Sequence, residues 1–292
     1  MDEYNSKLLH SQREGDYRKM IGFNHIGRLG RRGNQMFQYA ALRGIAAQNG
    51  YNFCFPFYAK GVDDGAGNIN RTELFDCFEM STVSSLNIQA IDSDRPYLQE
   101  ESFHFDERIF NNCPDWISLY GFFQSEKYFS NVKELIRKDF TFKEDIRKPC
   151  EEMMEGVYVE GVDSTIVGLH IRRSDYLTNP NHHALDISYY EDALKLFPDN
   201  AKIIVFSDDY KWCYQQLLFD DDRFLISENE NGHIDQCLMG MCTDFIIANS
   251  SFSWWAAWLA DRGRVVAPSE WFGPRNQHLD TKDIYCSNWI VI

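Results

Sequence analysis

The sequence has no long apolar run and no concentrated basic segment. Nowhere in the chain do about 18 apolar residues follow one another, as a membrane-spanning helix requires. The formal net charge is -15 over 292 residues, so the average surface repels a nucleic-acid polyanion. The first 20 residues lack the apolar core of a signal peptide or an anchor. We therefore expect a flexible extension over residues 1–20, a cytoplasmic location, no nucleic-acid partner and at most peripheral membrane contact.

The sequence also lacks a pattern that predicts a metal site. Its eight cysteines include no Cys-x-x-Cys pair and no histidine set at zinc-ligand spacing, so we expect free thiols in a reducing compartment. Asp92-Ser93-Asp94 imitates a metal-binding Asp-x-Asp, but it lies in a Pro-containing polar stretch typical of a loop. His182 and His183 are adjacent, so their side chains point apart in regular structure, and no third ligand accompanies them. We expect neither a metal ion nor a cofactor.

Apolar runs alternate with helical periodicity through most of the chain. Apolar residues make up 44% and aromatic residues 15% of the sequence, enough to build substantial cores. After Asn34 the apolar spacing predicts an amphipathic helix that ends at Gly50, and a strand is expected over residues 53–57. Four short apolar runs are typical of parallel strands buried on both faces. They cover residues 165–171, 202–207, 244–248 and 264–268.

This alternation predicts an α/β fold, and the length exceeds that of a usual single core. We predict two Rossmann-like lobes with a cleft between them. The N-terminal lobe is expected over residues 21–150 and the C-terminal lobe over residues 151–292. Ligands of such a sheet bind at the carboxyl ends of its strands.

Two arginines follow the first of these runs, at the expected ligand edge. Arg172 and Arg173 lie between His170 and Asp175. Two guanidinium groups at a strand end hold a diphosphate and stabilise the charge that develops on it when a glycosyl bond breaks, without a metal. The alternative is a surface arginine pair bound to Asp175.

Small polar or acidic residues follow two further runs. Asn249, Ser250, Ser251 and Phe252 follow the run at 244–248, where a helix begins, so free amides and hydroxyls point toward an anion; serine caps are the alternative. Asp208 and Asp209 follow the run at 202–207. A carboxylate there would accept both hydrogens of a guanine edge, or it would cap the next helix.

A glycine-rich loop precedes the first predicted helix. It runs from Gly27 to Gln35, in which Asn34 or Gln35 can bridge sugar hydroxyls and Arg28 is a further candidate for ligand contact. Glycines let a backbone approach a phosphate closely. The loop matches neither the dinucleotide fingerprint nor a P-loop.

Five segments, in this order, resemble the bacterial α-1,2-fucosyltransferases of glycosyltransferase family 11. The resemblance covers roughly residues 21–292 and rests on GNQMFQYAALR (33–43), GFFQSEKYF (121–129), VGLHIRRSDY (167–176), FSDD (206–209) and ANSSFSWWAAWL (248–259). It implies a GT-B-like fold, GDP-fucose as donor, a free or lipid-linked β-galactoside as acceptor, inversion at the fucose carbon and no metal.

The resemblance also implies roles for the candidate residues. Arg172 would bind the β-phosphate and stabilise departing GDP with support from Arg173, while Ser250 and Ser251 would donate to phosphate. Asp175 is our candidate base, although it would instead orient an arginine if the proton passes to solvent or phosphate. The remaining assignments are guanosine contacts for His170, Asp208 and Asp209, and donor or acceptor contacts for Asn34 and Gln35.

The chain departs from the family pattern at one place. Family members read Gly-x-Leu-Gly-Asn-Gln, whereas here Arg31-Arg32-Gly33 stands before Asn34. At about 3.3 Å per residue the insertion displaces Asn34 by several ångströms if it is extended, or it bulges away. The role of Arg28 depends on which occurs. Two other hypotheses remain: another GDP-fucose transferase with α-1,6 or protein O-linked specificity, and a non-catalytic protein that binds a GDP-sugar or a glycan.

Overall fold

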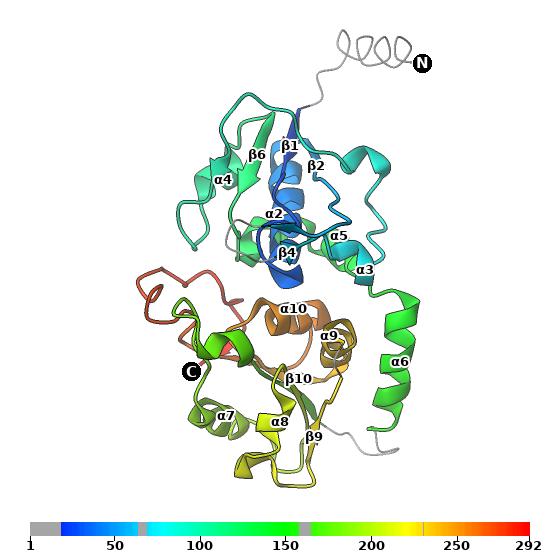
Figure 1. Cartoon of the computed structure of the whole chain (residues 1–292), viewed down its shortest axis with the longest axis vertical. Coiled ribbons are helices and arrows are strands. Elements are labelled where there is room, and N and C mark those ends of the chain that lie inside the picture. The colour runs from blue at the N-terminus through cyan, green and yellow to red at the C-terminus, as the bar shows by residue number, and fades with distance from the viewer. Residues whose placement is uncertain (1–18, 64–68, 158–164, 230) are drawn as a thin grey trace.

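The chain folds into two lobes, each built on a parallel sheet and stacked along the long axis of the molecule (Figure 1). The computed structural model describes residues 19–63, 69–157, 165–229 and 231–292. The predicted N-terminal extension therefore lies almost entirely outside the described residues. No helix in these ranges is long and apolar enough to cross a membrane.

The N-terminal lobe contains a four-stranded parallel sheet. Its strands are, in spatial order, β2 (Asn52–Cys54), β1 (Met20–Gly22), β6 (Ile117–Tyr120) and β5 (Leu98–Gln99). The short antiparallel pair β3 (Val62–Asp63) and β4 (Ile69–Asn70) stands apart from this sheet. Besides the long helix α2 (Arg32–Asn49), the described part of the lobe contains the short α-helices α3 (Leu74–Cys77), α4 (Glu107–Asn111) and α5 (Lys133–Asp139).

Helix α2 (Arg32–Asn49) is the central helix of this lobe, and it is the helix predicted from the apolar spacing. It begins two residues before Asn34 and ends at Gly50, whose φ of 68° is the left-handed conformation of a glycine cap. Gly44 lies against neighbouring backbone: an added Cβ would be 1.9 Å from the carbonyl oxygen of Tyr128. Because no side chain fits there, α2 packs closely on the segment that follows β6.

The C-terminal lobe contains a six-stranded parallel sheet. Its spatial order is β12 (Ile290–Val291), β11 (Val265–Ala267), β10 (Asp244–Ile246), β7 (Ile166–Ile171), β8 (Lys202–Ser207) and β9 (Phe224–Ile226). The chain runs outward from β7 to β9, then returns to β10 on the other side and continues to β12. This is the doubly wound Rossmann order, with its switch point between β7 and β10.

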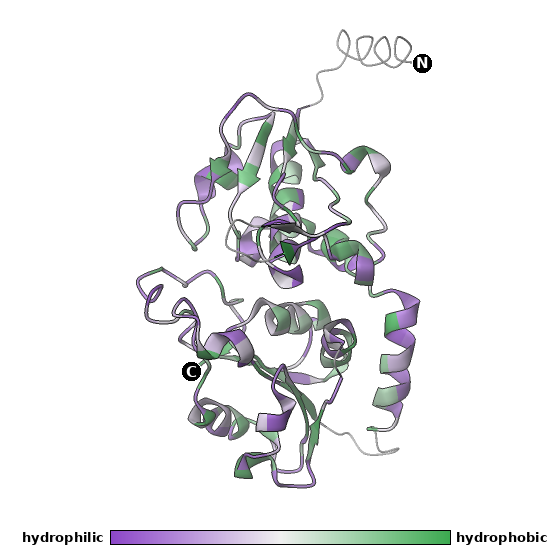
Figure 2. Ribbon diagram, viewed as in Figure 1, coloured by the Kyte–Doolittle hydropathy of each residue, from purple (hydrophilic) through white to green (hydrophobic). Residues whose placement is uncertain are grey.

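Helices cover both faces of this sheet. They are α7 (Ile187–Leu194), α8 (Tyr210–Cys213), α9 (Gly232–Met241) and α10 (Ser251–Ala260). The strands are green in Figure 2, as expected for strands covered on both sides, and β7 is buried along its whole length. The four predicted apolar runs correspond to β7, β8, β10 and β11, so the predicted α/β class is confirmed.

The two lobes share an apolar core at α10. Trp254 and Trp255 of α10 are fully buried, and Phe37 of α2 lies 4.4 Å from the ring of Trp254. Phe129, in the segment after β6, stacks on Trp255 at 5.5 Å. These tryptophans are packing residues. The contact fixes the N-terminal lobe above the first turn of α10.

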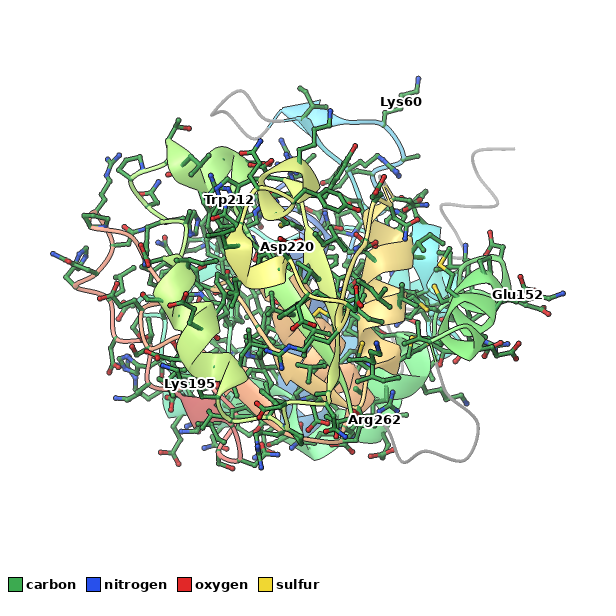
Figure 3. The ribbon with its side chains drawn as sticks, turned by 90° about the horizontal axis from the view of Figure 1, so that it is seen from below. Lys60, Glu152, Lys195, Trp212, Asp220 and Arg262 are labelled. Atoms are coloured by element: carbon green, nitrogen blue, oxygen red, sulfur yellow. The ribbon has the colours of Figure 1, made fainter. Side chains whose placement is uncertain are left out.

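Helix α6 (Glu144–Glu155) links the two lobes and runs along one side of the C-terminal lobe (Figure 1). It buries Ile146, Cys150 and Met154, whereas Glu152 points away from the body of the molecule (Figure 3). The predicted lobe boundary at residue 150 falls inside this helix. All eight cysteines of the chain, including Cys150, are free and buried.

The segment between β11 and β12 crosses back to the N-terminal lobe. Asp283 accepts hydrogen bonds from the backbone N–H of Phe105 and from Lys127 Nζ, at 2.9 and 2.5 Å. Phe272 packs edge-on against Phe103 at 4.8 Å. The C-terminal segment therefore joins both lobes on the side opposite α6 (Figure 1).

Candidate active site

A cavity of about 950 Å³ lies between the lobes, at the switch point of the C-terminal sheet. Its floor is formed where β7, β8 and β10 end, and its roof is the loop before α2. Ligands of doubly wound folds bind at this place because the chain diverges there and leaves a crevice. Predicted site residues that line it are Asn34, His170, Arg172, Asp175, Asp208, Ser250, Ser251 and Phe252.

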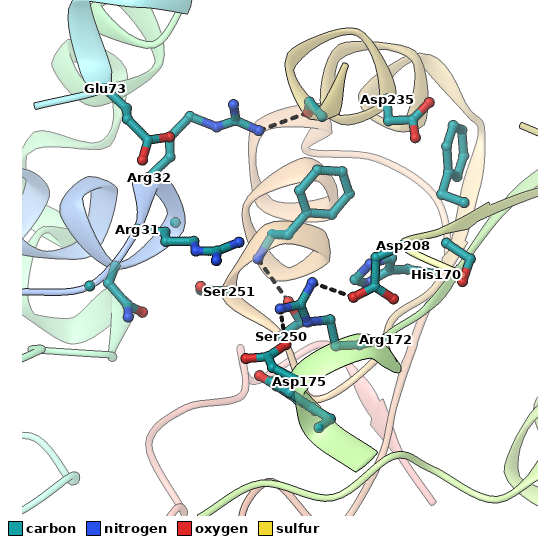
Figure 4. Close-up of a pocket in the computed structure, with 18 of the residues that line it drawn as sticks. Arg31, Arg32, Glu73, His170, Arg172, Asp175, Asp208, Asp235, Ser250 and Ser251 are labelled. Atoms are coloured by element: carbon teal, nitrogen blue, oxygen red, sulfur yellow. Dashed lines mark hydrogen bonds and ion pairs between the residues drawn. The ribbon is translucent and has the colours of Figure 1, made fainter. Parts of the chain in front are cut away.

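Arg172 faces the cavity from the end of β7 (Figure 4). Two carboxylates hold its guanidinium group, Asp175 through Nη2 and Asp208 through Nη1. Its charge also lies 5.1 Å from the ring centre of Tyr176. An arginine has five N–H donors, and these two bonds use two of them. The group is thus fixed in direction and still has donors for an anion.

Arg173 and Asp209, which the sequence assigns to donor binding, do not line the cavity. The Arg173 guanidinium stacks on Trp212 at 3.8 Å, and its Nε donates to Asp209 at 3.2 Å. Asp209 caps α8 by accepting from the backbone N–H of Trp212. Arg173 points away from Arg172, and Asp209 points away from Asp208. Through their contacts with each other and with Trp212, the two residues anchor α8 to the sheet.

Asp208 lines the cavity, but both of its oxygens are engaged. Oδ1 accepts from the backbone N–H of Arg173 at 2.9 Å, and Oδ2 accepts from Arg172. Asp208 therefore orients the arginine loop through a bond at each oxygen.

His170 is buried beside the cavity in its neutral form. Its Nδ1 lies 2.9 Å from the Ser253 hydroxyl, and its ring packs on Phe252 at 4.8 Å. Burial, with a smaller contribution from Arg172, lowers the pKa of His170 to about 3. A neutral imidazole offers a ligand one hydrogen-bonding nitrogen and an apolar face, without charge.

The first turn of α10 forms the wall next to Arg172. The hydroxyl of Ser250 caps the helix by accepting from the backbone N–H of Phe252, at 3.3 Å. Asn249 is outside the cavity: its Nδ2 donates to the carbonyl groups of His183 and Trp271, both at 3.1 Å. Asn249, whose predicted contact with the donor stays a prediction, thus holds the C-terminal segment at Trp271.

The two sequence segments that imitate metal sites, His182-His183 and Asp92-Ser93-Asp94, lie in different parts of the molecule. His182 lines the cavity and stacks on Tyr176 at 4.5 Å, while His183 pairs with Glu270 at 3.3 Å. Asp92 and Asp94 do not line the cavity. Within the described ranges no three His, Cys, Asp or Glu side chains are arranged to hold a metal ion.

The glycine-rich loop contributes Asn34 but not its other two candidates. Asn34 Oδ1 accepts from Gln124 at 2.9 Å and lines the cavity. Gln35 is fully buried and braces the loop by donating to the carbonyl groups of Gly30 and Arg71. Arg28 lies over the ring of Tyr58 at 5.7 Å, outside the cavity. Neither Gln35 nor Arg28 lines the cavity, and their ligand contacts stay predictions.

The inserted residues Arg31 to Gly33 form the start of α2 and connect the lobes. Arg32 is buried and donates to Gln236 Oε1 at 3.1 Å and to the Gly232 carbonyl at 2.8 Å, both in α9. Trp255 Nε1 donates to the Gly33 carbonyl at 3.0 Å. The insertion neither bulges away nor removes Asn34 from the cavity; it bonds the N-terminal lobe to the C-terminal lobe at the cavity rim.

Asp235 is a cavity residue that sequence reasoning missed. It is buried in the first turn of α9, and its Oδ1 accepts from Ser227 at 2.7 Å and from Asn229 at 3.2 Å. Neither bond uses Oδ2, and no cation pairs with it among the residues described. Burial raises its pKa. The signal that points to it is the apolar run Phe224–Ile226, whose end places residues 227–235 at the ligand edge.

Comparison with known proteins finds relatives of this chain among the glycosyltransferases. The profile of "Glycosyl transferase family 11" matches residues 75–292. The chain is 30% identical to the O-antigen biosynthesis glycosyltransferase WbnK of Escherichia coli, over 88% of this chain and 96% of WbnK. It is 31% identical to an alpha-1,2-colitosyltransferase of Escherichia coli, over 89% and 95% of the two chains. It is 28% identical to galactoside alpha-(1,2)-fucosyltransferase 1 of Bos taurus, over 79% and 64%.

A solved structure supports the fold. FUT1 of Arabidopsis thaliana, determined in complex with GDP, superposes with a TM-score of 0.55 at 12% identity, over 91% of this chain and 73% of that chain. The predicted two-lobe, GT-B-like architecture is thereby confirmed. Since the family profile also spans well over half of the sequence, the chain belongs to glycosyl transferase family 11.

Proposed function

We propose that this glycosyltransferase moves L-fucose from GDP-fucose to the 2-hydroxyl of a β-galactoside, with inversion at the fucose carbon. The observation that carries the proposal is the place of Arg172, whose guanidinium faces the cavity at the switch point, beside the first turn of α10. Family membership and the similarity to galactoside alpha-(1,2)-fucosyltransferase 1 support the choice of donor and linkage. The acceptor is a free or lipid-linked glycan, and the eight free cysteines favour a reducing, cytoplasmic location.

In this proposal the diphosphate of the donor lies between Arg172 and α10. The free N–H groups at the start of α10, with the hydroxyl of Ser251, donate to phosphate oxygens. Asp175 and Asp208 fix the guanidinium of Arg172 from behind. Its remaining N–H donors stabilise the negative charge that develops on GDP as the bond to fucose breaks. Such a site requires no metal ion to neutralise the leaving group.

The guanine base is assigned to the part of the cavity near α9. The carboxylate of Asp235 is assigned to accept from N1–H and N2–H of guanine, a donor pair that adenine and uracil do not present. Ser227 and Asn229 hold the carboxylate through Oδ1. Asp235 takes over the role that the sequence assigned to Asp208 and Asp209, because those two carboxylates are used within the protein.

An inverting transfer also needs a group that accepts the proton of the attacking hydroxyl. Asp175 is the assigned base: it lines the cavity, and its side chain is 54% exposed. The same carboxylate orients Arg172. Asn34, across the cavity and held by Gln124, is assigned to sugar hydroxyls of donor and acceptor.

The direct test is release of GDP from GDP-fucose with lactose or N-acetyllactosamine as acceptor. We expect acceptor-dependent release that persists with EDTA, and a product whose fucose is α-1,2-linked by linkage analysis. Tight GDP binding without release would favour a non-catalytic GDP-sugar-binding protein. An α-1,6 linkage or a fucosylated protein would replace the proposed acceptor specificity, and loss of activity in EDTA would refute metal independence.

Colitose transfer is a second candidate, because the chain is 31% identical to an alpha-1,2-colitosyltransferase. Colitose lacks the 3-hydroxyl of fucose. The same assay with both GDP-linked sugars at equal concentration separates the two, since the physiological donor is expected to have the higher kcat/KM.

Asp235→Asn is expected to weaken GDP binding about 10- to 100-fold, because a charged acceptor of two hydrogen bonds is lost. The wild type should prefer GDP over inosine diphosphate, which lacks the 2-amino group, and the variant should lose most of this preference. Isothermal titration calorimetry measures both dissociation constants.

Asp220→Asn is the matched control, since Asp220 is an exposed carboxylate away from the cavity (Figure 3). It should bind GDP like the wild type. If Asp235→Asn keeps the wild-type ratio of GDP to inosine diphosphate affinity, Asp235 does not contact the base edge.

A further inference from the structure

The three arginines that line the cavity differ in what they bind. Arg172 is held by Asp175 and Asp208, and Arg32 is buried and donates to α9. Arg31 is exposed, and no other described residue forms a hydrogen bond or ion pair with its side chain. An arginine at the wall of a ligand cavity with all its donors unused is suited to bind an anion.

The backbone directs Arg31 toward the first turn of α10. It is the residue before α2, with an extended conformation of φ -82° and ψ -178°. Two residues later, an added Cβ on Gly33 would lie 2.4 Å from the hydroxyl of Ser251. The loop therefore touches α10 where the diphosphate is assigned. Figure 4 shows the Arg31 guanidinium extending into the cavity toward Ser251, on the side of Arg172 that the two carboxylates leave open.

The wall of the cavity also contains several carboxylates, so an incoming diphosphate needs a further cation to bind. Besides Asp175 and Asp208, which Arg172 already binds, Glu73 and Asp235 line the wall. Burial raises the pKa of Glu73, and the charge of Arg32 opposes this more strongly than that of Arg31. An incoming diphosphate thus meets one guanidinium shared by two carboxylates. Among the described residues of the wall, Arg31 is the guanidinium that is free to neutralise it.

We propose that Arg31 is a second diphosphate-binding arginine, which contacts the phosphate groups of the GDP-sugar from the N-terminal lobe, opposite Arg172. The inference rests on the proposed function, because it requires GDP in this cavity. The bound diphosphate then connects both lobes, and its charge is shared between guanidinium groups on the two sides of the cavity.

The test is the binding of GDP, GMP and guanosine to Arg31→Ala, measured by isothermal titration calorimetry. Loss of a charged hydrogen-bond donor is expected to raise the dissociation constant for GDP about 10- to 100-fold, with a smaller effect on GMP and none on guanosine. Arg31→Lys should recover part of the affinity, because it keeps the charge but not the planar donor pair. Arg108→Ala is the matched control, because Arg108 is an exposed arginine outside the cavity, and it should bind GDP like the wild type.

The outcomes separate the inference from the function it rests on. If the wild type does not bind GDP, the proposed function fails. If the wild type binds GDP and Arg31→Ala binds it equally well, only the role of Arg31 is refuted. An equal loss of affinity for guanosine and GDP would also refute it, because the side chain would then act on the shape of the site. Circular dichroism and thermal unfolding check that the variant remains folded.

Discussion

Replacing Arg172 with alanine is expected to lower kcat for fucose transfer roughly 10³-fold, because the departing diphosphate loses a fixed cation. The loss should appear mainly in kcat, since the charge on the leaving group grows between the bound donor and the transition state. Asp175 and Asp208 would also lose their shared partner and face the phosphate as unpaired charges. Single-turnover kinetics with saturating donor and acceptor measure the chemical step directly.

Two further variants make this result specific. Arg173→Ala removes the neighbouring arginine, which stacks on Trp212 outside the cavity, so less than a tenfold change in kcat is expected even if stability falls. Asp175→Asn should lower turnover but spare GDP binding if Asp175 is the base. Equal losses of kcat in Arg172→Ala and Arg173→Ala would mean that the motif acts as a unit and that the separation seen in the structure is irrelevant to catalysis. Nearly full turnover of Asp175→Asn would remove it as the base.

The difference between Arg172 and Arg173 shows where sequence reasoning reaches its limit. The end of β7 was predictable, because a parallel strand buried on both faces is a continuous apolar run. The edge at which His170, Arg172 and Asp208 meet follows from the shared direction of such strands. Which of two adjacent arginines enters the cavity is decided by local backbone direction. That direction depends on partners such as Trp212, which lie far along the chain.

Asp235 was missed for a related reason. Strand β9 is only three residues long, Phe224–Ile226, and its run is too short to stand out from a loop. If that strand is not recognised, nothing in the sequence places Asp235, in the helix that follows, at the ligand-binding edge of the sheet. A composition-based search finds carboxylates near strand ends only when the strand itself is recognised.

The insertion at Arg31 to Gly33 was visible in the sequence, but its effect was not. Both sequence alternatives treated the three residues as a spacer that either moves Asn34 or leaves it in place. In the folded chain the side chain of Arg32 crosses to α9, and the Gly33 carbonyl accepts from Trp255. These partners come at least 200 residues later in the sequence, and local periodicity carries no information about them.

The second large effect is expected at Asp139, in the interior of the N-terminal lobe. Its carboxylate is fully buried and accepts from Tyr39, Arg43 and Thr82, at 2.6, 2.9 and 2.7 Å. Asp139→Ala should lower the free energy of unfolding by about 3–5 kcal/mol, because the buried Arg43 is left without its counter-charge. Asp139→Asn should cost nearly as much, since the amide keeps the shape but not the charge. Urea denaturation followed by fluorescence measures the loss.

A double-mutant cycle distinguishes the pair from the packing around it. Replacing both partners, Arg43→Met with Asp139→Leu, should recover much of the stability that either single replacement removes, since no unpaired charge then remains buried. The exposed pair Arg147 and Glu151 is the control, and Glu151→Ala should cost at most about 1 kcal/mol. If the double variant is as unstable as the sum of the single variants, the loss comes from cavities and unsatisfied hydrogen bonds of Tyr39 and Thr82. The buried ion pair would then serve to orient α2 against the segment after β6 without a stabilising charge interaction of its own.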